Sequence, residues 1–236
     1  MSPNQKQRAF TLVELMIALA LSGIVLAAVA HAFLGSKVSF MLNRGLATLQ
    51  DNGRHGIATL ERYVRMTGFQ NRNAALGPLD DAIGGTASPG SDTLPLRFGT
   101  GATPALTDCA GTMASANDLI ELAFTRDANN DLICKTLSLV SLKTTSVPLV
   151  SGVEYFAVRY GEDTNNDHIA DLFAAADKVT NMQNVIAVQL CLIVNSQDRT
   201  DAMSHTLIDC DGNKTTTADG LLRRRFLTTV NLRNRS

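Results

Sequence analysis

Tryptophan is absent from this chain of 236 residues, and aromatic residues make up only 5% of it. A hydrophobic core must therefore be built mainly from aliphatic side chains. The formal net charge is −1, so no strong field of one sign surrounds the molecule, and we expect no nucleic-acid partner. The length fits one or two domains.

Motifs that carry enzymatic chemistry are also missing. The sequence has no G-x-S-x-G, no H-E-x-x-H and no phosphate-binding glycine loop. The histidines are scattered and the cysteines form no C-x-x-C pair, which argues against a zinc site. We therefore expect a protein that is not an enzyme and requires no cofactor.

Formal charge is missing from residues 15–34, which are strongly apolar. A helix of this length, about 30 Å, spans the hydrocarbon core of a bilayer. Lys6 and Arg8 precede the segment, which favours a cytoplasmic N-terminus. An alternative is a secretory signal cleaved after "AHA" at residues 30–32, which would make Phe33 the first mature residue.

One carboxylate, Glu14, lies at the beginning of the apolar segment. An acid in hydrocarbon costs about 2.5–3.5 kcal/mol on insertion scales, so it generally has a partner. The surrounding stretch, "AFTLVELMIALALSGIVL", resembles the N-terminal signature of type IV pilins and of the related pseudopilins of type II secretion. The buried acid therefore has an explanation in that family.

The resemblance implies processing and assembly roles for individual residues. A prepilin peptidase would cut after Ala9, where the family usually has glycine, and the amine of Phe10 would be methylated. Glu14 would be the fifth mature residue and would pair with the N-terminal amine of a neighbouring subunit. An ion pair in low dielectric is favourable only when both partners are present, which agrees with pairing on assembly.

The helix is expected to continue beyond the membrane, because no proline occurs between Pro3 and Pro78. Apolar or small residues recur at steps of three and four and form an amphipathic stripe: Val38, Leu42, Leu46, Leu49, Gly53, Ile57, Leu60 and Val64. The pattern predicts one helix over about residues 10–67.

The remainder of the chain has the pattern of an antiparallel sheet. Residues 71–118 are predicted to be a loop, because Gly, Pro, Ser, Thr, Asn and Asp cluster there. Alternating apolar and polar residues predict strands at 118–126, 132–141, 152–160, 185–194 and 223–233. The fold class is α+β and type IV pilin-like, with a long N-terminal helix, transmembrane in its hydrophobic half, packed on an antiparallel sheet. The expected divisions are a leader (1–9), a transmembrane or filament-core helix (10–35) and a globular domain (36–236).

Later segments resemble one subgroup, the PilW minor pilins. The similarity lies in "TDCAG" (107–111), "DLIC" (131–134), "VRYGEDTNNDHIAD" (158–171) and the ending "LRRRFLTTVNLRNR". It implies a minor pilin that primes a type IV pilus or caps its tip. Its partners would be other minor pilins, the major pilin, the prepilin peptidase and the inner-membrane assembly platform.

The same resemblance implies a single-pass inner-membrane protein with a periplasmic domain, which later enters the extracellular pilus. Two alternatives stay open. One is a minor pseudopilin of type II secretion, and the other is a membrane-anchored periplasmic enzyme.

A calcium loop is a further candidate. In "DTNNDHIAD", oxygen ligands at positions 1, 3, 5 and 9 would come from the side chains of Asp163, Asn165, Asp167 and Asp171, and position 7 would offer the carbonyl of Ile169. Histidine at position 6 and alanine at position 12 depart from the calcium pattern. The alternative is a solvated turn stabilised by Asp and Asn side chains.

An even number of cysteines beyond a membrane segment suggests two disulfides in an oxidising compartment. Three pairings are possible. Nearest-neighbour pairing, Cys109–Cys134 and Cys191–Cys210, would close loops of about 25 and 20 residues, each worth about 3 kcal/mol. The PilW resemblance favours the first pair. Free buried thiols are the alternative.

The run of arginines at 223–225 is predicted to be a solvated face rather than a binding patch.

Overall fold

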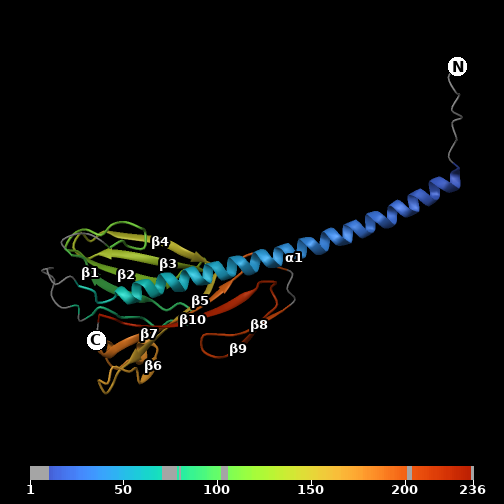
Figure 1. Cartoon of the computed structure of the whole chain (residues 1–236). Coiled ribbons are helices and arrows are strands. Elements are labelled where there is room, and N and C mark those ends of the chain that lie inside the picture. The colour runs from blue at the N-terminus through green and yellow to red at the C-terminus, as the bar shows by residue number, and fades with distance from the viewer. Residues whose placement is uncertain (1–10, 71–78, 80, 102–105, 201–203, 235–236) are drawn as a thin grey trace. The chain divides into compact units, whose positions relative to one another are not determined.

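The computed structural model describes residues 11–70, 79, 81–101, 106–200 and 204–234 (Figure 1). The predicted leader and the cleavage-site residues Ala9 and Phe10 lie outside the described residues. The chain divides into two compact units, Met1–Arg44 and Gly45–Ser236.

A single helix, α1 (Leu12–Met66), confirms the helix predicted from the apolar and amphipathic patterns. Its side chains are exposed from residue 12 to residue 40, including Leu12 and Phe33 at 75% and 69%. By length and composition this helix is able to cross a membrane. The exposed apolar segment therefore requires lipid or other helices around it.

From Gly45 onward, α1 packs on the sheets with one face. The buried residues on this face are Gly45, Leu49, Gly53, Gly56, Leu60, Tyr63 and Val64. The glycines permit close approach: a Cβ on Gly53 would lie 2.0 Å from Cε2 of Phe226, and one on Gly56 would lie 3.0 Å from Cδ1 of Leu192. The predicted stripe is therefore the packing face from Leu49 to Val64, whereas its first three members, Val38, Leu42 and Leu46, are exposed. At Gly53 and Gly56 the close contact requires glycine, which has no side chain.

Gly53→Ala is expected to destabilise the globular unit by about 1–3 kcal/mol, because the new methyl group overlaps the Phe226 ring and displaces it. Gly35→Ala is the matched control, since a Cβ at Gly35 meets nothing within 4 Å. Thermal unfolding of the full chain in detergent measures both. Equal melting temperatures for the two variants would contradict this packing.

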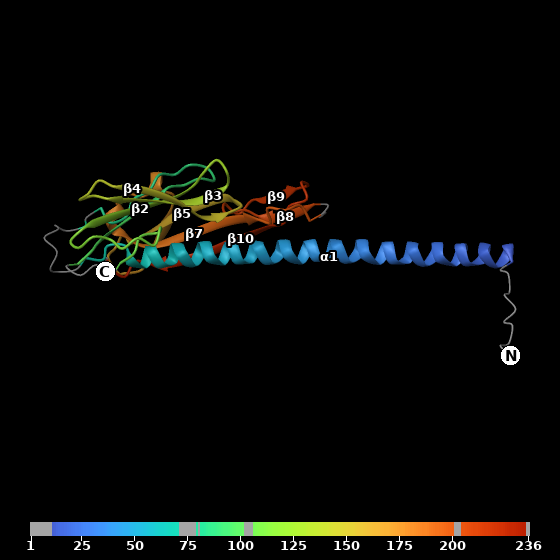
Figure 2. The same cartoon turned by 90° about the horizontal axis from the view of Figure 1, so that it is seen from above.

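Two four-stranded antiparallel sheets form the globular unit (Figure 2). The first has the order β1-β2-β3-β4, with bounds Leu94–Gly99, Leu119–Arg126, Asp131–Ser138 and Thr144–Ser151. The second has the order β10-β7-β5-β6, with bounds Arg223–Asn231, Val185–Asn195, Val153–Glu162 and Leu172–Ala174. A separate hairpin consists of β8 (His205–Ile208) and β9 (Lys214–Thr217), and short 3₁₀ turns η1 (Ala176–Lys178) and η2 (Met182–Asn184) precede β7.

One hydrophobic core joins the helix and both sheets. Leu60 and Val64 of α1 lie in the same cluster as Phe124 of β2, Leu132 of β3 and Leu192 of β7. The core is largely aliphatic, as the scarcity of aromatic residues predicts. The predicted α+β architecture, a long N-terminal helix packed on antiparallel strands, is therefore confirmed.

The prediction that residues 71–118 form only a loop is wrong, because β1 lies within this range and pairs with β2. The edge strand β4 was not predicted either. It contains Pro148, which an edge strand tolerates because one side of its backbone needs no partner. Residues 127–130 connect β2 to β3, and residues 209–213 connect β8 to β9.

Candidate functional site

Glu14 lies in the first turn of α1, on an exposed part of the helix. Its backbone N–H donates to Oγ1 of Thr11 at 3.2 Å, so threonine caps this end of the helix. No ion pair of the Glu14 side chain occurs among residues 11–70 and the other described ranges. An acid at a helix N-terminus is favoured by the helix dipole, but in hydrocarbon it still lacks a counter-charge.

Two disulfides pair the cysteines as nearest neighbours. Cys109 is joined to Cys134 of β3, and Cys191 of β7 is joined to Cys210 in the β8–β9 turn. The second bond therefore ties the β8–β9 hairpin to β7, one of the two inner strands of the second sheet. Free cysteines do not occur.

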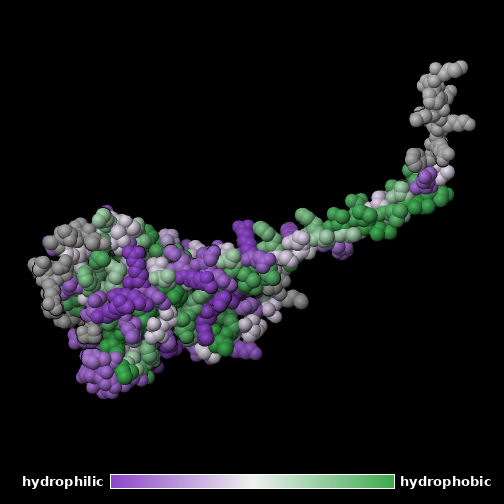
Figure 3. Space-filling view, viewed as in Figure 1, coloured by the Kyte–Doolittle hydropathy of each residue, from purple (hydrophilic) through white to green (hydrophobic). Residues whose placement is uncertain are grey.

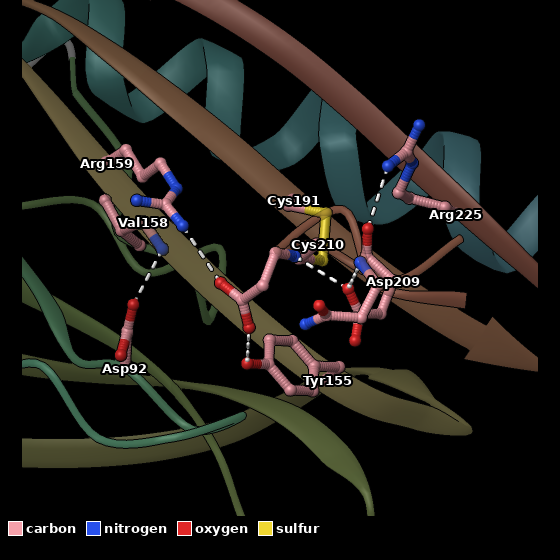
Figure 4. Close-up of a disulfide and its surroundings, with 10 residues drawn as sticks. Asp92, Tyr155, Val158, Arg159, Cys191, Asp209, Cys210 and Arg225 are labelled. Atoms are coloured by element: carbon pink, nitrogen blue, oxygen red, sulfur yellow. Dashed lines mark hydrogen bonds and ion pairs between the residues drawn. A yellow bond between two sulfur atoms is a disulfide. The ribbon is translucent and has the colours of Figure 1, made fainter. Parts of the chain in front are cut away.

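The Cys191–Cys210 disulfide holds a polar cluster against β5 (Figure 4). Beside Cys210, Asp211 accepts hydrogen bonds from the hydroxyl of Tyr155 at 2.7 Å and from Nη2 of Arg159 at 2.9 Å. Burial and the hydrogen bond to Asp211 raise the pKa of Tyr155 to about 12. Asp211 is more than 50 residues away in sequence from both partners, so no local sequence pattern predicts these hydrogen bonds.

The candidate calcium loop is closed by side-chain hydrogen bonds to its own backbone. Asp163 is buried, and its carboxylate accepts from the N–H groups of residues 165–168. Oδ2 of Asp171 accepts from the hydroxyl and the N–H of Thr164, and the hydroxyl contact lowers the pKa of Asp171. Oδ2 of Asp167 accepts from Nδ2 of Asn165 at 3.1 Å. This arrangement is that of an Asx-type turn.

The acidic side chains of the candidate calcium loop do not form a metal-binding group in this geometry. Among the described residues, no three His, Cys, Asp or Glu side chains converge in a way that could hold a metal ion. Ile169 donates its N–H to Oδ1 of Asp167 at 2.8 Å, so this residue also contributes to the turn. Calcium binding stays a prediction.

Asp163→Ala is expected to lower the free energy of unfolding by about 1–3 kcal/mol in EDTA, because the buried Asp163 carboxylate is the acceptor for several backbone N–H groups of the loop. Asp167→Ala is the control, since its carboxylate is exposed and, among the described residues, accepts hydrogen bonds only from Ile169 and Asn165. Chemical denaturation of the full chain in detergent measures the difference. Equal losses in the two variants would contradict the structural role of Asp163.

Repeating the denaturation in millimolar calcium tests the metal prediction. If the loop binds calcium, the wild-type chain gains stability and the variant with both Asp163 and Asp167 replaced by alanine does not. If calcium does not change the denaturation midpoint of the wild-type chain, the loop is a turn and not a calcium site.

The expectation of a solvated arginine face at 223–225 holds for Arg224 and Arg225, which are exposed, and is wrong for Arg223. Arg223 is buried and donates to both carboxylate oxygens of Glu154, at 2.6 and 2.8 Å, and to Asp219. The Arg223 guanidinium holds the pKa of Asp219 well below its usual range. This network joins β5, β10 and the segment after β9, so its role is structural.

Comparisons with known proteins agree with the geometry. Residues 4–30 match the family described as "Prokaryotic N-terminal methylation motif", and residues 123–234 match "Type IV Pilus-assembly protein W", PilW. A solved structure, the type IV-like pilin TTHA1219 from Thermus thermophilus, is similar with a TM-score of 0.57 and 15% identity, covering 80% of this chain and 97% of that chain. No curated protein matches the chain.

The exposed apolar helix, the sheets on which it packs and the methylation motif define a type IV pilin-like protein. Within that class the chain carries a PilW domain, so the predicted resemblance to the PilW family of minor pilins is confirmed. These matches support a structural pilin subunit, a role that entails contacts with other pilus components and with a prepilin peptidase. The N-terminal helix is consistent with membrane anchoring.

Proposed function

We propose that this chain is a minor pilin, a structural subunit that helps to prime type IV pilus assembly and lies at or near the tip. The observation that carries the proposal is the methylation motif at residues 4–30 in one chain with a PilW domain at 123–234. The exposed apolar part of α1 supports it, since this surface needs either a bilayer or the helices of other subunits.

In this proposal the N-terminus is cytoplasmic, the apolar part of α1 crosses the inner membrane and the unit from Gly45 to Ser236 is periplasmic before assembly. Two disulfides in that unit fit an oxidising compartment. The partners are other minor pilins, the major pilin, the prepilin peptidase and the assembly platform. On assembly the helix leaves the bilayer, and Glu14 neutralises the N-terminal amine of a neighbour.

Processing gives a direct test of the pilin class. We expect cleavage after Ala9, so that the mature chain begins at a methylated Phe10. Mass spectrometry of the N-terminal peptide from purified membranes measures this. A mature start at Phe33 would indicate a secreted protein and contradict the proposal.

A minor pseudopilin of type II secretion is the second candidate, because the methylation motif and the helix serve both systems. Deleting the gene and complementing it separates the two. The proposal expects loss of surface pili with normal secretion of exoproteins, and the reverse phenotype would favour the pseudopilin. A membrane-anchored enzyme would give neither phenotype.

A further inference from the structure

The outer face of α1 in the globular unit carries a basic stripe. It consists of exposed residues at helical spacing, on the side opposite the packing face: Ala47, Asp51, Arg54, His55, Ala58, Arg62 and Arg65. This set contains three arginines and one aspartate, so it is locally basic although the whole chain has a net charge of −1. In Figure 3 the polar colour covers much of the side of the globular unit on which α1 lies. We call this set the basic stripe.

The charges of the basic stripe are weakly engaged within the chain. The side chains of Arg54 and His55 form no hydrogen bond or ion pair with any residue that the structure describes. Arg62 lies over the ring of Tyr63 and reaches Oγ1 of Thr107 only at 3.4 Å. Arg65 lies 3.6 Å from Glu61, and its side chain is 49% exposed. The guanidinium groups therefore keep donors for an external acid.

We propose that the basic stripe binds an acidic helix face of another pilin-type subunit. The inference rests on the proposed function, which supplies neighbouring subunits, and adds the chemistry of the partner surface. The small side chain of Ala58 lies between Arg54 and Arg62, and that of Ala47 lies on the N-terminal side of Arg54, so a second helix can approach closely at both positions. Asp or Glu side chains spaced seven or eight residues apart on that helix would meet Arg54 and Arg62, which lie two turns apart.

A bilayer surface fits the basic stripe less well than a protein. Amphipathic helices that lie on a membrane insert an apolar face, but here the apolar face of α1 is buried against the sheets. A second copy of the chain in the same orientation would bring arginine against arginine, which is unfavourable. Charge complementarity therefore selects an acidic partner of a different sequence.

The test uses the full chain in cells that assemble pili, with p-benzoylphenylalanine in place of Ala58 or Ala47. Ultraviolet cross-linking and peptide mass spectrometry identify the attached segment. We expect an adduct with a helix of another pilin-type subunit that carries Asp or Glu next to the cross-linked residue. Arg54→Glu combined with Arg62→Glu should reduce the adduct yield about tenfold, because attraction becomes repulsion at two positions.

Matched variants separate charge from folding. Arg54→Lys combined with Arg62→Lys keeps the charge and should retain the adduct. Lys178→Glu reverses an exposed charge on η1 and should leave the adduct unchanged. Lysine in place of the partner's Asp or Glu next to the cross-linked residue should restore the adduct of the Arg54→Glu, Arg62→Glu chain.

An adduct with phospholipid, an adduct with a second copy of this chain, no adduct at either position, or a yield unaffected by charge reversal would each overturn the inference. These results leave the proposed function intact if the chain still begins at Phe10 and enters pili. Failure of the proposed function appears separately, as a start at Phe33.

Discussion

Replacing Cys191 and Cys210 together with alanine is expected to lower the free energy of unfolding by about 3 kcal/mol, because the bond closes a loop between residues 19 apart. The loss has a local component. The β8–β9 turn that carries Asp211 is no longer fixed to β7, so the contacts of Asp211 with Tyr155 and Arg159 weaken (Figure 4). Denaturant unfolding under non-reducing conditions measures the change.

The other disulfide provides the control for this prediction. Replacing Cys109 and Cys134 with alanine opens a loop of similar length, with a separation of 25, and should cost a similar free energy. Only the Cys191–Cys210 variant should shift the pKa of Tyr155 from about 12 toward its ordinary value of 10.0. Absorbance titration of the tyrosines detects this. An unchanged titration in that variant would contradict the role given to the disulfide.

Glu14→Val is expected to leave membrane insertion intact and to abolish most incorporation into pili. Removing an acid from hydrocarbon favours insertion by about 2.5–3.5 kcal/mol, so the amount of chain in the membrane should not fall. In the proposed filament, a neighbour's amine would lose its counter-charge, and breaking a buried pair in this way costs about 3–5 kcal/mol. The effect therefore belongs to assembly and not to the monomer.

The measurement compares the abundance of the chain in membranes with its recovery in sheared pili. Leu15→Val is the control, because it alters the adjacent exposed apolar residue without changing charge. Normal incorporation of the Glu14→Val chain would show that Glu14 has no assembly role.

Periodicity in the sequence was sufficient to predict α1 and the longer strands. The stripe from Leu49 to Val64 repeats at helical spacing and is buried in the structure, because one face of the helix covers a single core. Strands β2, β5 and β7 are rich in β-branched and aromatic residues and lie close to the predicted ranges. The longest elements bury the most apolar surface, so their patterns were the clearest.

The elements that were not predicted carry weak patterns. Strand β4, "TTSVPLVS", is an edge strand with few buried side chains, and β6 has only three residues. Their conformation is set by pairing with strands distant in sequence rather than by local preference.

The polar contacts were equally hidden in the sequence, because Arg223 and Glu154 lie 69 residues apart and Asp211 and Tyr155 lie 56 apart. In contrast, Glu14 was identifiable as a site from sequence alone, since an acid within an apolar segment is conspicuous without any knowledge of tertiary structure.

The most direct test of the central claim is the N-terminal peptide of this chain in purified, sheared pili. The account predicts that the filament fraction contains the chain and that its first residue is a methylated Phe10. A chain that is absent from the filaments and begins at Phe33 in the periplasm would contradict it.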